Sequence, residues 1–250
     1  MYTNNKLIYE GKAKKILASK NPEEVIVKFK DDATAFNAAK KSTFEGKGEL
    51  NCFISEIIFK YLKNKNIPTH YIEGNSKDSF IAQKVDIIPL EVVVRNTAYG
   101  SICKQTNIKP GTELKDPLLD FYYKDDDLND PLLTLDRINL MNIVRQEELI
   151  LIRELTNTIN LMLKEFFSNI QIKLVDFKVE YGRNSNGKIV LADEFSPDNC
   201  RLWDLKSNNG KIESLDKDRF RHDLGDLIEA YSEISNRIKN FISSTQKSNF

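Results

Sequence analysis

The sequence has few cysteines and no excess of either charge. Its three cysteines, Cys52, Cys103 and Cys200, are widely spaced among 250 residues and form no CxxC pair. This spacing argues against a disulfide framework and against a zinc cluster. The 37 basic residues balance 37 acidic residues, whereas a nucleic-acid-binding protein usually carries a clear basic excess. We therefore expect no nucleic acid partner, although charge neutrality leaves room for a local basic pocket that binds a small phosphorylated ligand.

Long apolar runs are also missing from the sequence. No stretch approaches the roughly 20 apolar residues of a membrane-spanning helix. The segment Met1–Lys6 lacks the apolar run of a signal peptide. We therefore expect a cytoplasmic protein without a membrane partner. With 40% hydrophobic residues, the chain is long enough for one large domain or two small ones, each with a core.

The first third of the chain alternates short apolar runs with turn signals. This pattern predicts strands at 7–9, 15–17, 25–29, 80–82 and 90–94, and apolar spacing predicts a helix over 48–63. Between the last two strands lies Asp86-Ile87-Ile88-Pro89. Because proline cannot donate to a strand ladder, we expect this segment to connect two sheets or lobes.

The remainder of the chain predicts a larger mixed lobe. We expect an α+β fold, with a small β-rich lobe over 1–86 and a larger lobe over 87–250. The elements expected in the second lobe are loops over 107–136 around a short strand at 121–123, a helix over 146–167, strands at 172–179 and 188–192 joined by a turn at 184–187, and a final helix over 218–241.

The strands around this last turn carry the most informative polar residues. Alternation places Asp176, Lys178 and Glu180 on one face of their strand, opposite an apolar face. Across the turn, Asp193 shares a face with apolar residues, and Glu194 is expected to point the other way. Carboxylates from the two strands can converge on a Mg²⁺ ion, because this cation prefers oxygen ligands. A solvated strand face with cross-strand ion pairs would show the same pattern.

The segment 193–204 that follows is rich in acidic, hydroxyl and arginine side chains. Loops on a rigid scaffold often carry function, so this composition favours a functional site over a solvated strand face.

Two further segments could bind anions. The glycine and lysines of 11–15 lie between two predicted strands, where backbone and ammonium groups can approach a phosphate. The segment is not a Walker A loop, and an exposed hairpin is the simpler alternative. Arg95 ends a strand, and Ser101 follows at a possible helix start. That pair suits a phosphate or carboxylate but also fits an ordinary turn.

Six motifs together resemble the SAICAR synthetase family. The resemblance runs from about Leu7 to Tyr231, and the order of the motifs makes it specific. They are YEGKAKK at 9–15, KDDATAFN at 30–37, GKGELN at 46–51, IPLEVVVRN at 88–96, VDFKVE at 175–180 and DEFSPD at 193–198.

The resemblance implies a two-lobed fold similar to ATP-grasp and kinase-like proteins, with ATP bound between the lobes. It implies a ligase of purine biosynthesis that joins L-aspartate to the carboxylated aminoimidazole ribonucleotide CAIR, using ATP and Mg²⁺ and acting as a homo-oligomer. The implied site residues are Gly11, Lys12, Ala13, Lys14, Ile87, Ile88 and Lys124 for ATP; Glu180 and Asp193 for Mg²⁺; Arg95, Ser101, Asp176, Lys178, Asp198, Arg201 and Arg221 for CAIR; and Lys12, Asp176, Lys178, Glu180 and Asp193 for catalysis.

Three positions, Tyr99, Gln105 and His222, depart from the family pattern, and these departures bear on the phosphate site rather than on the acidic strands. Two other classes of function stay open. A kinase or another ATP-dependent ligase would share the cleft, but the chain has no HRD or DFG motif. A non-enzymatic nucleotide- or RNA-binding module would bind nucleotide without forming ADP, and neither a basic excess nor an RNP-type aromatic pattern supports it.

Overall fold

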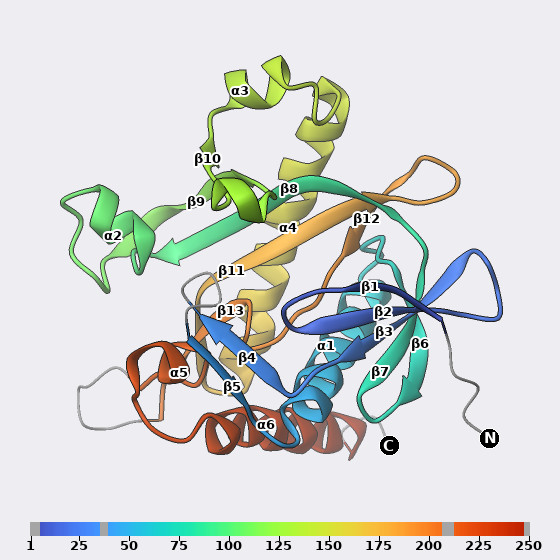
Figure 1. Cartoon of the computed structure of the whole chain (residues 1–250). Helices are drawn as coiled ribbons and strands as arrows, with labels where there is room; N and C mark the ends of the chain where they lie inside the picture. Colours follow the sequence, from blue (N-terminus) through green and yellow to red (C-terminus); the bar gives the residue numbers. More distant parts are fainter. Residues whose placement is uncertain (1–5, 36–39, 207–212, 248–250) are drawn as a thin grey trace.

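The computed structural model describes residues 6–35, 40–206 and 213–247, so Phe36 and Asn37 of the second motif lie outside the described residues. Two antiparallel sheets dominate the fold, with one long helix packed against each (Figure 1). Within the described ranges, no helix is long and apolar enough to cross a membrane.

The first sheet contains only N-terminal strands, in the order β1-β2-β3-β7-β6. The helix α1 (Lys47–Asn64) packs against three of them because its apolar residues recur at helical spacing. Its buried face includes Ile54, Ile58 and Leu62. The strands are β1 (Leu7–Glu10), β2 (Lys14–Ala18), β3 (Glu24–Phe29), β6 (Tyr71–Ser76) and β7 (Ser79–Gln83).

The second sheet carries the longest strands, in the order β10-β9-β8-β11-β12, with β13 also paired to β11. The helix α4 (Gln146–Asn169) packs on β8 and β11, which leaves the other face of these central strands free to line a site. The strands are β8 (Asp86–Thr97), β9 (Glu113–Tyr123), β10 (Leu132–Leu133), β11 (Ile172–Arg183), β12 (Ile189–Ala192) and β13 (Cys200–Asp204).

The remaining helices and the short hairpin lie outside the two sheets. The C-terminal helix α6 packs against α1, so the end of the chain supports the N-terminal half (Figure 1). These elements are the hairpin β4 (Asp32–Ala35) and β5 (Lys40–Thr43), the helices α2 (Ser101–Gln105), α3 (Leu135–Leu140), α5 (Asp218–His222) and α6 (Leu227–Lys247), and the 3₁₀ turn η1 (Asp126–Leu128).

One hydrophobic core runs through both halves of the molecule. Phe195 shows how the halves meet. Its ring centroid lies 5.5 Å from that of Phe59 in α1 and 6.3 Å from that of Phe177 in β11. All three rings are buried almost completely. The two sheets therefore share their apolar packing.

The prediction for Asp86-Ile87-Ile88-Pro89 was wrong, because these residues lie inside β8 rather than between two strands. The chain changes sheets just before them, between β7 and β8. In the ladder to β11, Glu91 pairs with Glu180 and Ile87 with Gly182, so β8 bulges between these pairs. Pro89 lies in this bulge, where its missing N–H costs no ladder hydrogen bond.

Two further predictions need correction. The predicted final helix over 218–241 is two helices, because the chain turns at Asp223 (φ 52°) and Gly225 (φ 119°), and an α-helix does not accommodate positive φ angles.

The region predicted as loops over 107–136 contains a strand, β9, that is much longer than the predicted residues 121–123. Pro117 interrupts the strand pattern in the sequence of β9. In the structure, the ladder between β8 and β9 is irregular around this proline, between the pairs Arg95–Leu118 and Thr97–Glu113.

Candidate active site

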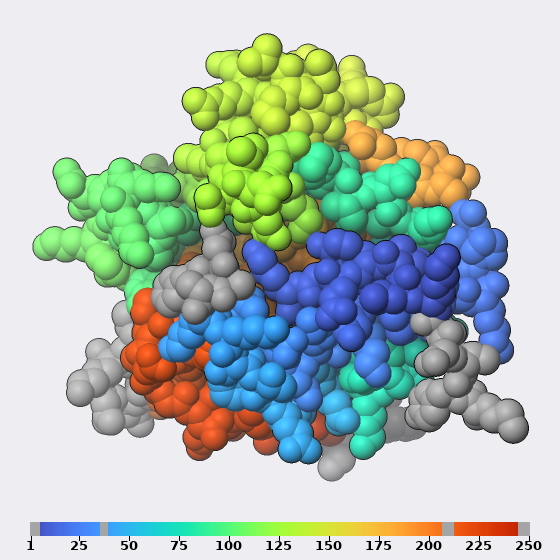
Figure 2. All heavy atoms as spheres, in the orientation of Figure 1, coloured from blue at the N-terminus to red at the C-terminus, as the bar shows by residue number. Residues whose placement is uncertain are grey.

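A cavity of about 320 Å³ lies over the free face of β8 and β11. All seven residues that the resemblance implied for CAIR line it. Figure 2 shows this face of the molecule hollowed between the dark-blue β1–β2 segment and the yellow-green segment that follows β9. The seven are Arg95, Ser101, Asp176, Lys178, Asp198, Arg201 and Arg221.

Strand register explains why these residues meet. Asp176 pairs across the ladder with Arg95 of β8 on one side and with Arg201 of β13 on the other. Lys178 and Glu180 follow at a spacing of two residues, while Val175, Phe177 and Val179 between them are buried. The predicted alternation along β11 is confirmed, and it places charges from three strands in one row.

The three arginines form one end of the cavity. Arg95 is buried and donates hydrogen bonds to Asp120 (2.7 Å), to Ser101 Oγ (2.9 Å) and to Tyr122 Oη (3.0 Å). Arg201 donates to Asp176 (2.7 Å) and Asp218 (2.8 Å), and Arg221 donates to Asp218 (2.6 Å). Planar guanidinium groups held in this way are suited to bidentate binding of phosphate or carboxylate.

The backbone next to this end is shaped around Arg201. Gly100 has φ +70°, and a Cβ built there would lie 2.9 Å from a guanidinium nitrogen of Arg201. The Arg201 guanidinium also lies 5.5 Å from the ring centroid of Tyr99, in cation–π geometry. Tyr99 is one of the departures from the family pattern, and in this chain its ring supports the arginine.

Lysines and carboxylates form the other end of the site. Lys178 Nζ contacts Glu180 (2.5 Å), Asp193 (3.0 Å) and Glu91 (3.1 Å), and Lys14 contacts both Asp193 and Glu194. Burial alone would lower the pKa of Lys14, but the carboxylates of Asp193 and Glu194 outweigh it and raise that pKa. Burial would raise the pKa of Asp193, yet Lys14 and Lys178 hold it below its usual range. Lys14 and Asp193 are therefore both charged at neutral pH.

Glu194 corrects one expectation, because it faces the same lysine as Asp193 instead of pointing away. β12 ends at Ala192, and Asp193 has a left-handed backbone (φ 65°), so strand alternation no longer applies there. Ser196 Oγ donates a hydrogen bond to the other oxygen of Glu194. The turn thus presents two consecutive carboxylates to Lys14.

The residues implied for ATP lie beside the cavity rather than in its wall. Gly11, Lys12 and Ala13 form the turn between β1 and β2, and Lys12 reaches Asp126 (2.7 Å) in the η1 turn between β9 and β10 of the second sheet. Lys124 contacts Glu180 (2.8 Å). In β8, Ile87 is exposed and Ile88 is buried.

The side chains that hold Asp198 were not predicted. Asp198 forms a 2.6 Å ion pair with Lys47, which is completely buried, and accepts hydrogen bonds from Asn51 (3.1 Å) and Tyr231 (2.8 Å). Burial would raise the pKa of Asp198, but the charges of Lys47 and Lys217 and the hydrogen bond from Tyr231 outweigh burial and lower that pKa. Lys47 and Asn51 stand four residues apart in the third motif, and this helical spacing is a signal that could have identified the pair.

Glu91 was missed although the sequence contained its signal. Glu91, Val93 and Arg95 alternate with buried Val92 and Val94, so all three face the cavity. The same alternation that we applied to β11 would have placed Glu91 on the face of β8 that carries Arg95. The ladder then pairs Glu91 with Glu180.

The donor set of Glu180 and Asp193 fits a magnesium ion. Both carboxylates already converge on one cationic atom, Lys178 Nζ. Among the described residues, no cluster of three or more acidic, histidine or cysteine side chains forms a complete metal site. Magnesium often takes only one or two protein carboxylates and completes its shell with phosphates and waters, so two carboxylates suffice.

The fold and the site define a two-lobed α+β protein whose charged cleft can hold phosphorylated ligands at two ends. Comparison with known proteins identifies the family. The model of the SAICAR synthetase family matches residues 7–238, and the chain belongs to this family. It is therefore an ATP-dependent ligase of purine biosynthesis that joins L-aspartate to CAIR to give SAICAR, as the motifs indicated.

Similar proteins agree in sequence and in structure. The phosphoribosylaminoimidazole-succinocarboxamide synthase of Prochlorococcus marinus subsp. pastoris is 67% identical, over 97% of this chain and 100% of that protein. The crystal structure of the Ehrlichia chaffeensis synthase superposes with a TM-score of 0.90 at 44% identity, covering 94% of this chain and 98% of the other. A SAICAR synthetase solved in complex with ADP has a TM-score of 0.88 at 46% identity, covering 93% and 97%. The predicted fold class is confirmed.

Proposed function

We propose that the arginine end of the cavity binds CAIR and that the lysine end binds the phosphates of ATP. One observation carries this assignment: the face of β11 bears Asp176 at the arginine end and Glu180 at the lysine end, with Lys178 between them. A relative at 46% identity binds ADP, which supports a nucleotide at one of these ends. The two reacting groups would then meet beside Lys178.

The ribonucleotide would be held mainly through its phosphate. Arg95, Arg201 and Arg221 offer guanidinium groups, and Ser101 offers a hydroxyl from the first turn of α2. Asp176 holds the Arg201 guanidinium in place. Asp198 lines the same cavity, and we assign it to the CAIR side, with its carboxylate fixed by Lys47.

ATP would lie between the β1–β2 turn and the start of β8. The turn formed by Gly11, Lys12 and Ala13 would cover the phosphates, with the Lys14 ammonium beneath it. Ile87 and Ile88 would offer backbone groups to adenine, and Lys124 would lie near the nucleotide. The exposed start of β8 supports this position of the base, because its end of the strand is accessible.

Glu180 and Asp193 would hold Mg²⁺. A bound magnesium ion neutralises phosphate charge and orients the phosphate oxygens. The lysines next to these carboxylates, Lys14 and Lys178, stay protonated and can stabilise phosphate oxygens without giving up a proton. Lys12, in the β1–β2 turn, would add a further ammonium group.

The chemistry would take place in two steps. A carboxylate oxygen of CAIR attacks the γ-phosphorus of ATP, which forms an acyl phosphate and releases ADP. The neutral amine of L-aspartate then attacks the acyl carbon, phosphate leaves with its bonding electrons, and the amine loses a proton to give the amide. Phosphoryl transfer depends mainly on positioning and charge neutralisation, and this row of charges can supply both.

Coupled ADP production tests the proposal. We expect ADP only when CAIR, L-aspartate, ATP and Mg²⁺ are all present. ADP formed at the full rate without L-aspartate would indicate a kinase. Tight nucleotide binding without any ADP would instead indicate a binding module.

We further propose a cytoplasmic homo-oligomer. The three cysteines are free, which supports a reducing compartment. Light scattering on the purified protein checks the oligomeric state, and a monomer at working concentration would contradict it.

A further inference from the structure

A tyrosine of the cavity wall is not among the residues that the resemblance implied. Tyr122 of β9 lines the cavity together with Glu91, Arg95 and Ser101. It pairs with Glu91 across the β8–β9 ladder, at the lysine end, yet its hydroxyl oxygen lies 3.0 Å from Nη2 of Arg95, at the arginine end. The phenol ring therefore runs along the wall between the two ends, with its hydroxyl beside an arginine.

The guanidinium of Arg95 is largely engaged within the protein. Its Nε donates a hydrogen bond to Asp120 (2.7 Å), and its Nη1 donates to the carbonyl of Tyr99 (3.3 Å). The nitrogen Nη2 carries two hydrogens, which go to Ser101 Oγ (2.9 Å) and to Tyr122 Oη (3.0 Å). Because Nη2 has no further hydrogen to give, its positive charge acts on a ligand through these two hydroxyl groups.

A hydroxyl that accepts a hydrogen bond keeps its own hydrogen to donate. Among the residues that the structure describes, the Tyr122 hydroxyl accepts from Arg95 and donates to no acceptor. Accepting from a cation also polarises the hydroxyl, which strengthens its own donation. The hydroxyl of Tyr122 is thus a polarised donor in the cavity wall.

The positions of the two hydroxyls suit a phosphate group. Ser101 Oγ and Tyr122 Oη lie 2.9 and 3.0 Å from the same nitrogen atom, so one ligand group with several acceptor oxygens can take a hydrogen from each. A phosphate monoester has such oxygens, and the arginines at this end match its charge. Building on the proposed function, we propose that Tyr122 donates its hydroxyl hydrogen to the phosphate of CAIR.

Tyr122→Phe tests this role, because it removes the hydroxyl and keeps the ring. Loss of a hydrogen bond to a charged group should raise the KM for CAIR about 10- to 100-fold, while kcat and the KM values for ATP and L-aspartate change less than about twofold. The matched control is Tyr123→Phe on the same strand, since Tyr123 packs against the core and does not line the cavity. This control should match the unsubstituted protein.

Calorimetry with two ligands shows which part of CAIR the hydroxyl contacts. CAIR and its nucleoside, which lacks the phosphate, are each titrated into protein saturated with ADP. Tyr122→Phe should lose about 10-fold or more in affinity for CAIR, but less than about twofold for the nucleoside. Melting temperatures show whether the variant is folded.

A double substitution separates direct contact from support of Arg95. In an Arg95→Lys background, no guanidinium remains for Tyr122 to hold. If Tyr122 itself contacts the phosphate, adding Tyr122→Phe should still weaken CAIR binding about fivefold or more. If Tyr122 only orients the guanidinium, adding it should change nothing, and the proposal would fail.

The outcomes also separate this inference from the proposed function. A folded Tyr122→Phe protein that keeps its KM and its affinity for CAIR would overturn the role of Tyr122. Equal losses for CAIR and for the nucleoside would overturn it as well, since the hydroxyl would then serve the ribose or the base. Absence of ADP from the unsubstituted protein with all substrates present would instead refute the proposed function.

Discussion

At the scale of single residues, the cleft is built from cations that the protein has already paired. Arg201, for example, holds Asp176 and Asp218 at 2.7 and 2.8 Å. Burial would lower the pKa of Arg201, but these two carboxylates raise it further above its usual range. The guanidinium is thus fixed in place, so a ligand phosphate would meet a donor that needs no reordering.

Removing one charge at the lysine end should stop turnover. We predict that Asp193→Asn lowers kcat by about 100-fold or more, because the proposed magnesium site and the two lysines lose a negative partner. The far-UV spectrum should stay unchanged, and Asp136→Asn on the exposed α3 serves as the control. ADP release at a near-normal rate would contradict the assignment of Asp193.

The arginine end should respond in binding rather than in turnover. Arg201→Ala should raise the KM for CAIR about 10- to 100-fold, as expected for a lost charged hydrogen bond. Arg201→Lys keeps the charge but not the two-pronged geometry and should fall in between. Arg153→Ala on the exposed face of α4 is the matched control. If only the KM for ATP rises, Arg201 belongs to the nucleotide side.

Sequence motifs located the charged residues that line the cavity better than the residues that support them. Arg95, Asp176 and Arg201 meet in the structure as the resemblance implied. The helical spacing of Lys47 and Asn51 could mark these two residues as a pair. It could not place Lys47 beside Asp198, because this ion pair joins residues 151 positions apart. Such a contact arises only when α1 packs beside the 193–199 turn.

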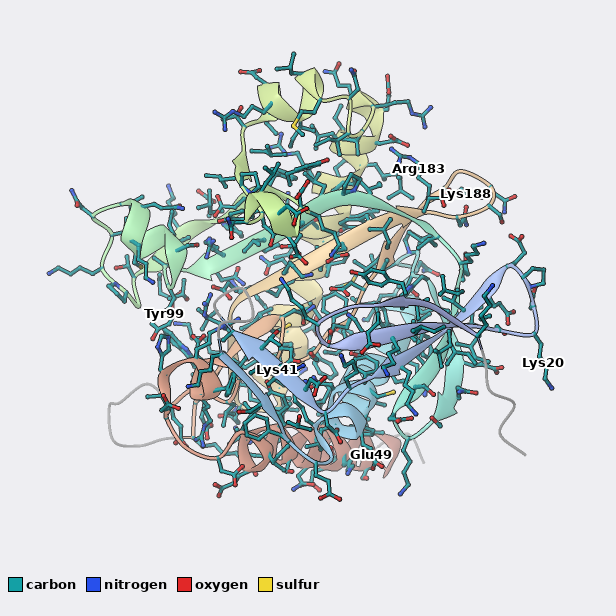
Figure 3. The ribbon with its side chains drawn as sticks, in the orientation of Figure 1. Lys20, Lys41, Glu49, Tyr99, Arg183 and Lys188 are labelled. Atoms are coloured by element: carbon teal, nitrogen blue, oxygen red, sulfur yellow. The ribbon has the colours of Figure 1, made fainter. Side chains whose placement is uncertain are left out.

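At the scale of elements, one buried carboxylate ties the start of α4 to the end of β11. Glu148 accepts two hydrogen bonds from Arg183 (2.8 and 2.7 Å) and one from the backbone N–H of Arg145 (2.9 Å). Figure 3 shows Arg183 at the end of the β11–β12 hairpin that lies far from Tyr99. The hydrogen bond from Arg183 lowers the pKa of Glu148, although burial opposes it.

This pairing predicts a pH-dependent stability. Glu148→Gln should lower the unfolding free energy by about 1–3 kcal/mol at pH 7. Because the folded-state pKa is depressed, the contribution is complete above the unfolded-state pKa and is lost as the pH falls from about 5 toward the folded-state value. Urea unfolding at several pH values measures the difference. Glu147→Gln, at the adjacent exposed position, should have little effect, and a pH-independent difference would contradict the ionic explanation.

Elements with a strong period were predictable, and irregular strands were not. The helices α1 and α4 begin and end within two residues of their predicted limits, because their apolar stripes are continuous. β9 and the start of β8 escaped prediction, because each contains a proline that a ladder irregularity accommodates. A sequence pattern alone cannot show where such an irregularity will fall.

At the scale of the whole molecule, the proposed division between residues 86 and 87 falls at the start of β8, just after the chain changes sheets, and it does not separate two cores. The continuous core and the packing of α6 on α1 join the lobes. We therefore predict one cooperative unfolding transition, with calorimetric and van't Hoff enthalpies that agree. Two resolved transitions would show that the lobes unfold independently.

Phe195 offers a test of this coupling. Phe195→Ala should destabilise the protein by about 3–5 kcal/mol, as large truncations in a core do. Because the ring contacts both Phe59 and Phe177, the variant should shift the entire transition to lower temperature. Phe195→Leu should shift it less. A shift in only half of the spectroscopic signal would contradict a shared core.

The strand β8 has a consequence for how this molecule can vary. Glu91 at the lysine end and Arg95 at the arginine end belong to one uninterrupted run of backbone, four residues or about 13 Å long. The distance between the lysine end and the arginine end is thus set by the number of residues between Glu91 and Arg95. One inserted residue in this run would turn Arg95 toward α4 and leave a valine in its place. Insertions and deletions should be tolerated at the exposed turn after Arg183, but not between Glu91 and Arg95 in β8.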